Sequence, residues 1–600
     1  MTQKYIHNNR LNDAFMRFLT WREKHIGERT FLMFLALVTG VLAGLAAQLL
    51  KYLIHLISTT LTAHVDIASG NYLYILLPTL GVLITALYVR YVVKDNISHG
   101  VTRVLWSISQ NKSRLKRHAT YSSLIASSVT IGFGGSVGAE GPIVYSGAAI
   151  GSNLGSMFRM SPRILMILVG CGAAAGIAGI FKAPIAGMLF TLEVLMIDLT
   201  GLTVMPLMIS SIAGATVAYV LEGYNAEFFF AQSEAFTTSR IPFTIALGVV
   251  CGLMSYYFTK VMFWMETIFR RIKSQGWRIV TGGILIAGLV FVFPPLYGEG
   301  YNAINELLEG NVGDVLNGTA FYFDRDNVWF IALFIAMITL MKAFATSATN
   351  GAGGVGGTFA PSLFVGALTG FLFAYILNNL DLGFTLSQKN FTLMGMAGVM
   401  SGVMHAPLMA IFLTAEMTGG YNLFLPLLIV SILAYITIQL FLPYSIYTMR
   451  LAKAGDLLTH QKDKAVLTLL KMDKLIEKDF KCVKPEMNLK EVVDVISVSK
   501  RNLFPVVDDD GNLKGVVLLD DIRNIMFRTD LYKKMHVSRF MTATPAVLDV
   551  NEPMDKVMNT FDKTNAWNLP VVDNGKYVGF VSKSKIFNSY RQVLKHFLDD

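Results

Sequence analysis

The chain has 600 residues, a net charge of +10 and a mean hydropathy of +0.50, with 53% hydrophobic and only 15% charged residues. A soluble protein does not need so many apolar stretches with a length of about 20 residues, which is the length that spans a bilayer. The composition therefore predicts a polytopic membrane protein. It argues against nucleic-acid binding, because the basic residues form no patches interleaved with aromatic side chains.

Basic residues near the start of the chain predict its orientation. Residues 1–30 form a basic segment, and the first long apolar run begins near Phe31. Residues 59–72 contain no Lys or Arg, and basic residues return from Lys94 onward. Because basic loops stay in the cytoplasm, we expect a cytoplasmic N-terminus and an external loop at 59–72. The first apolar run is too long for the core of a cleavable signal peptide.

An internal duplication is the most informative pattern. Residues 138–151 (GAEGPIVYSGAAIG) match residues 357–370 (GTFAPSLFVGALTG) in three glycines, a proline and an alanine. A second pair, 179–193 and 402–416, matches at Gly, Ala-Pro, Thr and Glu. In a membrane, duplicated halves with helices interrupted by Gly and Pro point to a transport site between the repeats.

The chemistry of these motifs favours an anion. A helix N-terminus presents unpaired N–H groups and a partial positive charge, and proline in the first turn begins a helix without losing a needed donor. Two such starts brought together make an anion site of neutral donors, from which an ion such as chloride can be released. Glu140 lies inside the first motif. An ionisable group at membrane depth is usually functional, so its carboxylate could occupy the anion site until it is protonated.

Residues 30–450 resemble the CLC chloride channels and chloride/proton antiporters. The family signatures G-[KR]-E-G-P and G-x-F-x-P are found at residues 138–142 and 357–361, and G-S-G-I-P is matched loosely at 98–102. The resemblance implies an α-helical inverted repeat of broken, tilted helices, a homodimer with one anion pathway per subunit, and no enzymatic activity. It also implies Glu140 as the gate. The anion-binding residues it implies are His99, Gly100, Gly141, Thr358, Phe359, Ala360 and Tyr444.

Three departures from the family pattern bear on mechanism. Ala139 replaces the basic residue next to the gate, and His99 replaces a serine that faces the anion. Val194 follows Glu193 where many antiporters carry a second glutamate as the internal proton relay. Because valine takes no proton, we expect channel-like or weakly coupled chloride flow. If protons instead pass through Glu140 and Glu193 without a carboxylate at Val194, the protein is an antiporter. A structural role for Glu193, paired with backbone, is an equal alternative.

The composition changes after about residue 451. Residues 451–477 are charged and predict a linker, and residues 478–600 resemble a tandem pair of CBS domains, because Phe504-Pro-Val-Val-Asp recurs as Leu569-Pro-Val-Val-Asp. Such pairs often bind adenine nucleotides, but here each copy is incomplete. The candidate residues are Asp521, Ser582 and Lys585. We expect mainly a structural, dimer-stabilising tail.

These patterns give four segments: a cytosolic segment at 1–30, a membrane domain at 31–450 with repeats near 31–230 and 240–450, a linker, and the CBS pair. The predicted function is transport of chloride across a membrane, the bacterial inner membrane by expectation, with the CBS pair in the cytoplasm. The predicted partners are a second subunit, lipid, chloride and protons, and no metal or cofactor is required. An alternative of another class is a membrane-bound nucleotide sensor that carries no ions.

Overall fold

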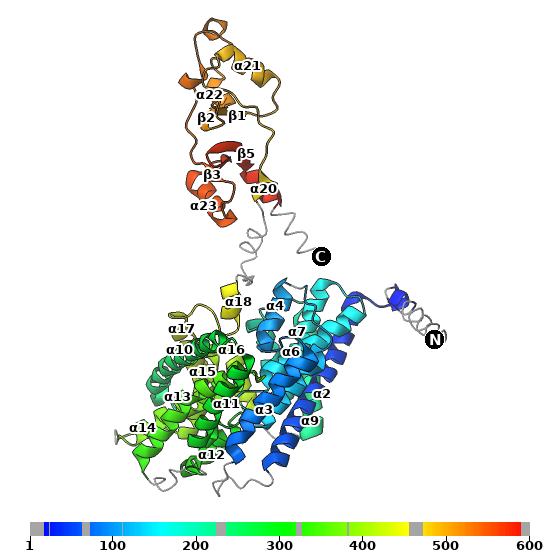
Figure 1. Cartoon of the computed structure of the whole chain (residues 1–600), viewed down its shortest axis with the longest axis vertical. Coiled ribbons are helices and arrows are strands. Elements are labelled where there is room, and N and C mark those ends of the chain that lie inside the picture. The colour runs from blue at the N-terminus through cyan, green and yellow to red at the C-terminus, as the bar shows by residue number, and fades with distance from the viewer. Residues whose placement is uncertain are drawn as a thin grey trace. The chain divides into compact units, whose positions relative to one another are not determined.

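The computed structural model describes residues 17, 19–22, 24–62, 73–110, 112–223, 236–317, 319, 327–380, 383–454 and 472–589. The chain divides into two compact units, residues 1–457 and 458–600 (Figure 1). The first sixteen residues of the predicted basic segment, most of the predicted external loop at 59–72 and most of the predicted linker at 451–477 lie outside the described residues.

The first unit is helical. Among the described residues, eight helices are long and apolar enough to cross a membrane, which confirms the prediction of a polytopic membrane protein. The helices of its first half are α2 (Glu28–Thr62), α3 (Leu73–Leu87) with the π-helical turn η2 (Tyr88–Val93), α4 (Gly100–Gln110), α5 (Ala119–Gly132), α6 (Glu140–Met157), α7 (Pro162–Phe181), α8 (Pro184–Glu193) and α9 (Val204–Glu222).

The second half repeats this order with α10 to α17. Its elements are the 3-10 turn η3 (Thr238–Arg240), α10 (Ile241–Arg271), α11 (Gln275–Val292), η4 (Pro294–Leu296), α12 (Tyr301–Glu309), η5 (Val312–Leu316), α13 (Val328–Ala352), α14 (Phe359–Asn378), α15 (Gln388–Met404), α16 (Pro407–Met417) and α17 (Phe424–Gln439). The short helix α18 (Thr448–Ala454) follows. In Figure 1 the blue and cyan helices of the first half stand beside the green helices of the second.

The two halves pack in the same way. Helix α6 lies on α7 as α14 lies on α15, and α2 contacts α7 and α9 as α10 contacts α15 and α17. Equivalent helices also meet each other across the boundary between the halves, α3 with α11 and α8 with α16. An element that contacts its own equivalent lies near a two-fold axis. The fold is therefore the duplicated arrangement of broken helices that the sequence predicts.

Local sequence sets where the equivalent helices begin and end. Helix α7 begins after Ser161 and α15 after Ser387, and each serine hydroxyl accepts a hydrogen bond from a backbone N–H of the first turn. Such caps satisfy donors that a helix start otherwise leaves unpaired. The two helices end at Lys182 and His405, which share a left-handed φ of 55°. His405 is therefore the C-cap residue of α15.

Several duplicated glycines are needed for close helix packing. A Cβ at Gly147 of α6 would collide with the backbone of Gly172 in α7. The equivalent residue of the second half, Gly366 of α14, meets Gly395 of α15 in the same way. Small residues allow membrane helices to approach until their backbones touch. These glycines consequently hold the helix pairs that carry the two broken starts.

The second unit contains two small α/β modules. The first has the hairpin β1 (Leu503–Val507) and β2 (Leu513–Leu518), and the second has the sheet order β3 (Leu548–Asp549), β4 (Asn568–Asp573), β5 (Lys576–Ser582). Their helical elements are α20 (Met472–Leu475), α21 (Leu489–Ser497), α22 (Leu519–Ile522), η7 (Thr529–Leu531), η8 (Val537–Arg539) and α23 (Met554–Thr564). Met472 and Leu475, at the end of the predicted linker, are buried in the core of the second module.

Candidate functional site

The starts of α6 and α14 are joined by a pair of glycines. The N–H of Gly138 donates to the carbonyl of Gly357 at 3.0 Å, and the N–H of Gly357 donates back to Gly138 at 2.6 Å. These glycines are equivalent in the two repeats, so their reciprocal bonds lie on the pseudo-two-fold axis. A Cβ at Gly141 would lie only 3.0 Å from the Cα of Gly357, which shows how closely the two chains approach.

Both helix starts keep uncapped backbone donors. Neither Ala139 nor Thr358, the residues before α6 and α14, makes a side-chain cap. Pro142 and Pro361 have no N–H, and the next amides of each helix bond within it. The first-turn donors are therefore the backbone amides of Glu140, Gly141, Phe359 and Ala360. The helix dipoles add partial positive charge here, so the arrangement can hold a small anion.

The carboxyl group of Glu140 lies at these helix starts. The residue is 1% exposed, and Tyr301 Oη donates to its Oε1 at 3.1 Å. The backbone amides of Glu140 itself and of Ala360 also act on the carboxyl group. Its Oε2 lies against Gly138, where a Cβ would collide with it. The side chain thus occupies the space in which the predicted anion would meet the donors.

The tyrosine near these helix starts is Tyr447 and not Tyr444. Tyr447 is 5% exposed and interacts with Thr358 and Glu140, whereas Tyr444 is 37% exposed. The backbone carbonyl of Tyr447 also accepts a hydrogen bond from Thr102 Oγ1 at 3.3 Å. The geometry therefore favours Tyr447 over the predicted Tyr444 at this site. The segment between α17 and α18 is irregular, so helical periodicity gives no means of choosing between the two tyrosines.

His99 directly precedes α4, and Gly100 is the first residue of this helix. Both lie on the same side as Tyr447. A Cβ at Gly100 would meet the carbonyl oxygen of Gly141, so this glycine packs directly on the start of α6. His99 has a left-handed φ of 57°, and its Nε2 lies 3.9 Å from Glu266 Oε1. Arg450 and Arg270 bond the same Glu266 carboxylate at 3.1 and 2.6 Å. The described partners of the His99 ring are therefore in this charged cluster.

Glu193 and Glu416 each cap the helix of the other repeat. The Glu193 carboxylate accepts hydrogen bonds from the amides of Leu408 and Met409 at 3.1 and 2.8 Å, at the start of α16. Glu416 accepts from Ile185 and Ala186 at 3.0 and 2.9 Å, at the start of α8. Acidic groups at helix N-termini are stabilising. The backbone pairing named as an alternative for Glu193 is therefore present, and the neighbouring Val194 is 2% exposed.

Not all of the residues that are predicted to bind a nucleotide in the second unit can reach a ligand, because one of them is bonded within the protein. Ser582 Oγ donates to Glu477 Oε1 at 2.8 Å and accepts from the N–H of Lys585 at 3.1 Å. Glu477 also holds Arg501 at 2.7 Å. Asp521 and the Lys585 side chain are exposed. A carboxylate next to the Ser582 hydroxyl disfavours a phosphate at that position.

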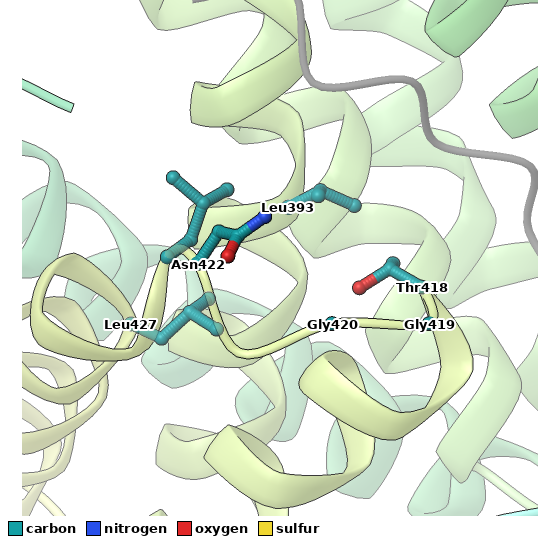
Figure 2. A pocket seen from close by; sticks show the side chains of 7 residues that line it. Leu393, Thr418, Gly419, Gly420, Asn422 and Leu427 are labelled. Carbon is teal, nitrogen blue, oxygen red and sulfur yellow. The ribbon is translucent and has the colours of Figure 1, made fainter. Parts of the chain in front are cut away.

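Two other kinds of candidate site, a metal site and a pocket, give less evidence of function. Among the described residues, no group of three or more His, Cys, Asp or Glu side chains could hold a metal ion. A small pocket lies where α15 meets the turn between α16 and α17, lined by Leu393, Thr418, Asn422 and Leu427 among others (Figure 2). It includes none of the predicted site residues.

Fold and site together define a class: duplicated membrane proteins in which two broken helices present backbone amides beside a protonatable carboxylate. The family model described as voltage gated chloride channel matches residues 80–439, and the CBS domain model matches residues 472–528 and 537–591. The chain belongs to the voltage gated chloride channel (CLC) family and carries a C-terminal CBS pair.

Relatives and solved structures agree with this assignment. The chain is 28% identical to a putative chloride channel protein ClcB-like of Ralstonia nicotianae, over 64% of this chain and 86% of the relative. It is 26% identical to the H(+)/Cl(−) exchange transporter ClcA of Vibrio cholerae, over 70% and 88%. A slow cyanobacterial Cl−/H+ antiporter shares the fold with a TM-score of 0.60 at 22% identity, covering 72% of this chain and 98% of that one. A eukaryotic CLC transporter covers 92% and 97%, with a TM-score of 0.59 at 18% identity.

Proposed function

We propose that the protein transports chloride and similar monovalent anions across a membrane through the helix starts of α6 and α14. One observation carries the proposal: the Glu140 carboxyl group lies at the uncapped amides that the Gly138–Gly357 bridge brings together. Backbone amides bind chloride without the full charge that would hold it too tightly. Relatives described as chloride channels and as chloride/proton exchangers support the choice of ion.

Glu140 acts as the gate in this proposal. When it is ionised, its carboxylate satisfies the amides and excludes chloride from them. When it is protonated, the negative charge is lost and an anion can replace it. Chloride flux should therefore increase as the pH falls and depend on this one carboxyl group.

Proton coupling is weak or absent in our proposal. Val194 cannot carry a proton, and the carboxylate of Glu193 is already paired with two backbone amides of α16. These two hydrogen bonds make the Glu193 carboxylate a structural cap of α16. The chain is therefore proposed to be channel-like or loosely coupled.

The test is chloride efflux from lipid vesicles that contain the full-length protein, with the internal pH recorded at the same time. Chloride efflux without proton movement is the expected result. Uphill proton movement driven by a chloride gradient would overturn the weak coupling and make the protein an antiporter with another internal proton path. Absence of chloride flux, together with tight binding of radiolabelled nucleotide, would instead favour the membrane-bound sensor.

Membership of the family supports a proposal for the assembly and the placement of the protein. We propose a homodimer with one anion pathway per subunit, in a bacterial inner membrane, with the N-terminus and the CBS pair in the cytoplasm. The CBS pair is proposed to serve as a structural tail. The pairing of Ser582 with Glu477 supports this role, because it occupies the hydroxyl that a nucleotide would need.

A further inference from the structure

A second carboxyl group lies directly behind the gate. The short segment between η4 and α12 includes Glu299, whose Oε1 accepts a hydrogen bond from the N–H of Ala139 at 3.0 Å. Tyr301, two residues later, donates to Glu140 at 3.1 Å. One loop of the second repeat therefore touches both the gate residue and the residue before it. Glu299 and Glu140 interact as like charges.

A buried lysine fixes this loop in place. Lys342 of α13 is 0% exposed, and its Nζ donates to the carbonyl oxygens of Gly298 and Glu299 at 3.0 and 3.2 Å. It also lies 4.7 Å from the ring centroid of Phe364 in α14. The Glu299 carboxylate also attracts the Lys342 ammonium group electrostatically. Lys342 thus fixes the backbone of the loop that carries Glu299.

We propose that Glu299 is a positioning residue that sets the pH at which the Glu140 gate opens, an inference that rests on the proposed gate function. Two carboxylates that share one poorly solvated site resist being ionised together. A negative charge on Glu299 favours the protonated form of Glu140, and the nearby Lys342 ammonium group attracts that negative charge. The described titratable groups that act on the pair include Lys342 of α13, Tyr301 of α12 and Tyr447.

The residue next to the gate, Ala139, is part of this arrangement. Ala139 brings no side-chain charge to the start of α6, so its backbone N–H meets a carboxylate where the family pattern places a basic residue. A basic side chain there would favour an ionised gate, whereas Glu299 favours a protonated one. The gate of this protein should therefore stay open to a higher pH than it would without Glu299.

The test is the Glu299→Gln variant in the full-length protein, reconstituted in vesicles, with chloride efflux measured across a series of pH values. We expect the pH of half-maximal flux to move about one unit toward acid, which is roughly tenfold less flux on the alkaline side. The Glu299→Asp variant keeps the charge and should keep the midpoint near that of the unaltered protein. Glu309→Gln, at the other end of α12, is the matched control and should leave the midpoint unchanged.

A double variant separates this inference from the gate itself. Glu140→Gln/Glu299→Gln should be as insensitive to pH as Glu140→Gln alone, because Glu299 acts through Glu140. An unchanged or more alkaline midpoint in Glu299→Gln, with a normal Glu140 dependence, would overturn the role of Glu299 and leave the gate intact. Loss of flux at every pH in both Glu299 variants would also overturn it and make the residue a requirement of the fold. A pH response that survives Glu140→Gln would overturn the gate function instead.

Discussion

The starts of α6 and α14 are built alike and differ in one side chain. Both begin two residues after a glycine of the Gly138–Gly357 bridge, both lack a side-chain cap, and both carry proline in the first turn. The first helical residue is Glu140 in one copy and Phe359 in the other. Phe359 stacks on Phe181, with centroids 5.4 Å apart, and leaves its amide as a plain donor. The duplication therefore supplies a symmetric set of donors, and only the first copy adds a carboxylate to it.

Removing the carboxylate that distinguishes the two helix starts should have the largest effect on chloride flux. The Glu140→Gln variant replaces the titrating group with a neutral amide of the same shape, so chloride flux should become independent of pH and lose any proton coupling. Vesicle efflux across a pH series measures this directly. Tyr301→Phe is the companion variant. It removes the hydrogen bond to Oε1 but keeps the carboxylate, so it should keep a pH-dependent flux.

Glu193 and Glu416 each cap a helix of the other repeat. They test whether the two repeats are also equivalent away from the starts of α6 and α14. Each accepts two backbone amides, so Glu193→Gln and Glu416→Gln should each lower the free energy of unfolding by about 1–3 kcal/mol. Thermal unfolding of the purified protein in detergent would measure both. If Glu193→Gln alone abolished proton movement while Glu416→Gln did not, Glu193 would be a proton carrier and the symmetric structural role would be wrong.

The choice of Tyr447 over Tyr444 predicts a smaller effect on anion affinity. Tyr447→Phe removes a buried hydroxyl next to Thr358 and should weaken chloride binding by about 1 kcal/mol, or roughly fivefold. Tyr444→Phe is the matched control and should bind chloride as the unaltered protein does. Isothermal titration with chloride distinguishes them. The opposite ranking of the two variants would restore Tyr444.

The smallest expected effect concerns the second duplication, the CBS pair. Because Ser582 is bonded to Glu477, we expect no measurable binding of adenine nucleotides to the full-length protein in equilibrium dialysis. Ser582→Ala should leave that result unchanged and cost about 1 kcal/mol of unfolding free energy at most. Micromolar binding that disappears in Asp521→Asn would show that the structural interpretation of the tail is wrong.

Repetition explains why much of the site could be predicted. Gly138, Glu140, Phe359 and Ala360 belong to motifs that occur twice, and a motif repeated within an apolar background limits where helices start. The structure brings all four to one place. The correspondence of Glu193 and Glu416 also suggested pairing with backbone, although sequence could not show that each residue caps the other repeat.

Residues outside the duplication were harder to find. Tyr447 was missed because an irregular segment has no period that fixes which side chain points inward. Glu299, Tyr301 and Lys342 come near the gate only through the tertiary fold. One signal was nevertheless available: Lys342 is the one charged residue between 328 and 352. A lone charge in an apolar run at membrane depth indicates a polar partner nearby.

The bridge between Gly138 and Gly357 also bears on the origin of the chain. Each glycine bonds to its own counterpart, so the contact needs only one kind of residue. In a half-length polypeptide that assembled with a second copy of itself in the opposite orientation, one glycine codon would have specified both sides of the bridge. Joining two such halves in one gene then allowed the copies to diverge. A carboxylate could be kept in one half alone, which a dimer of identical short chains cannot achieve.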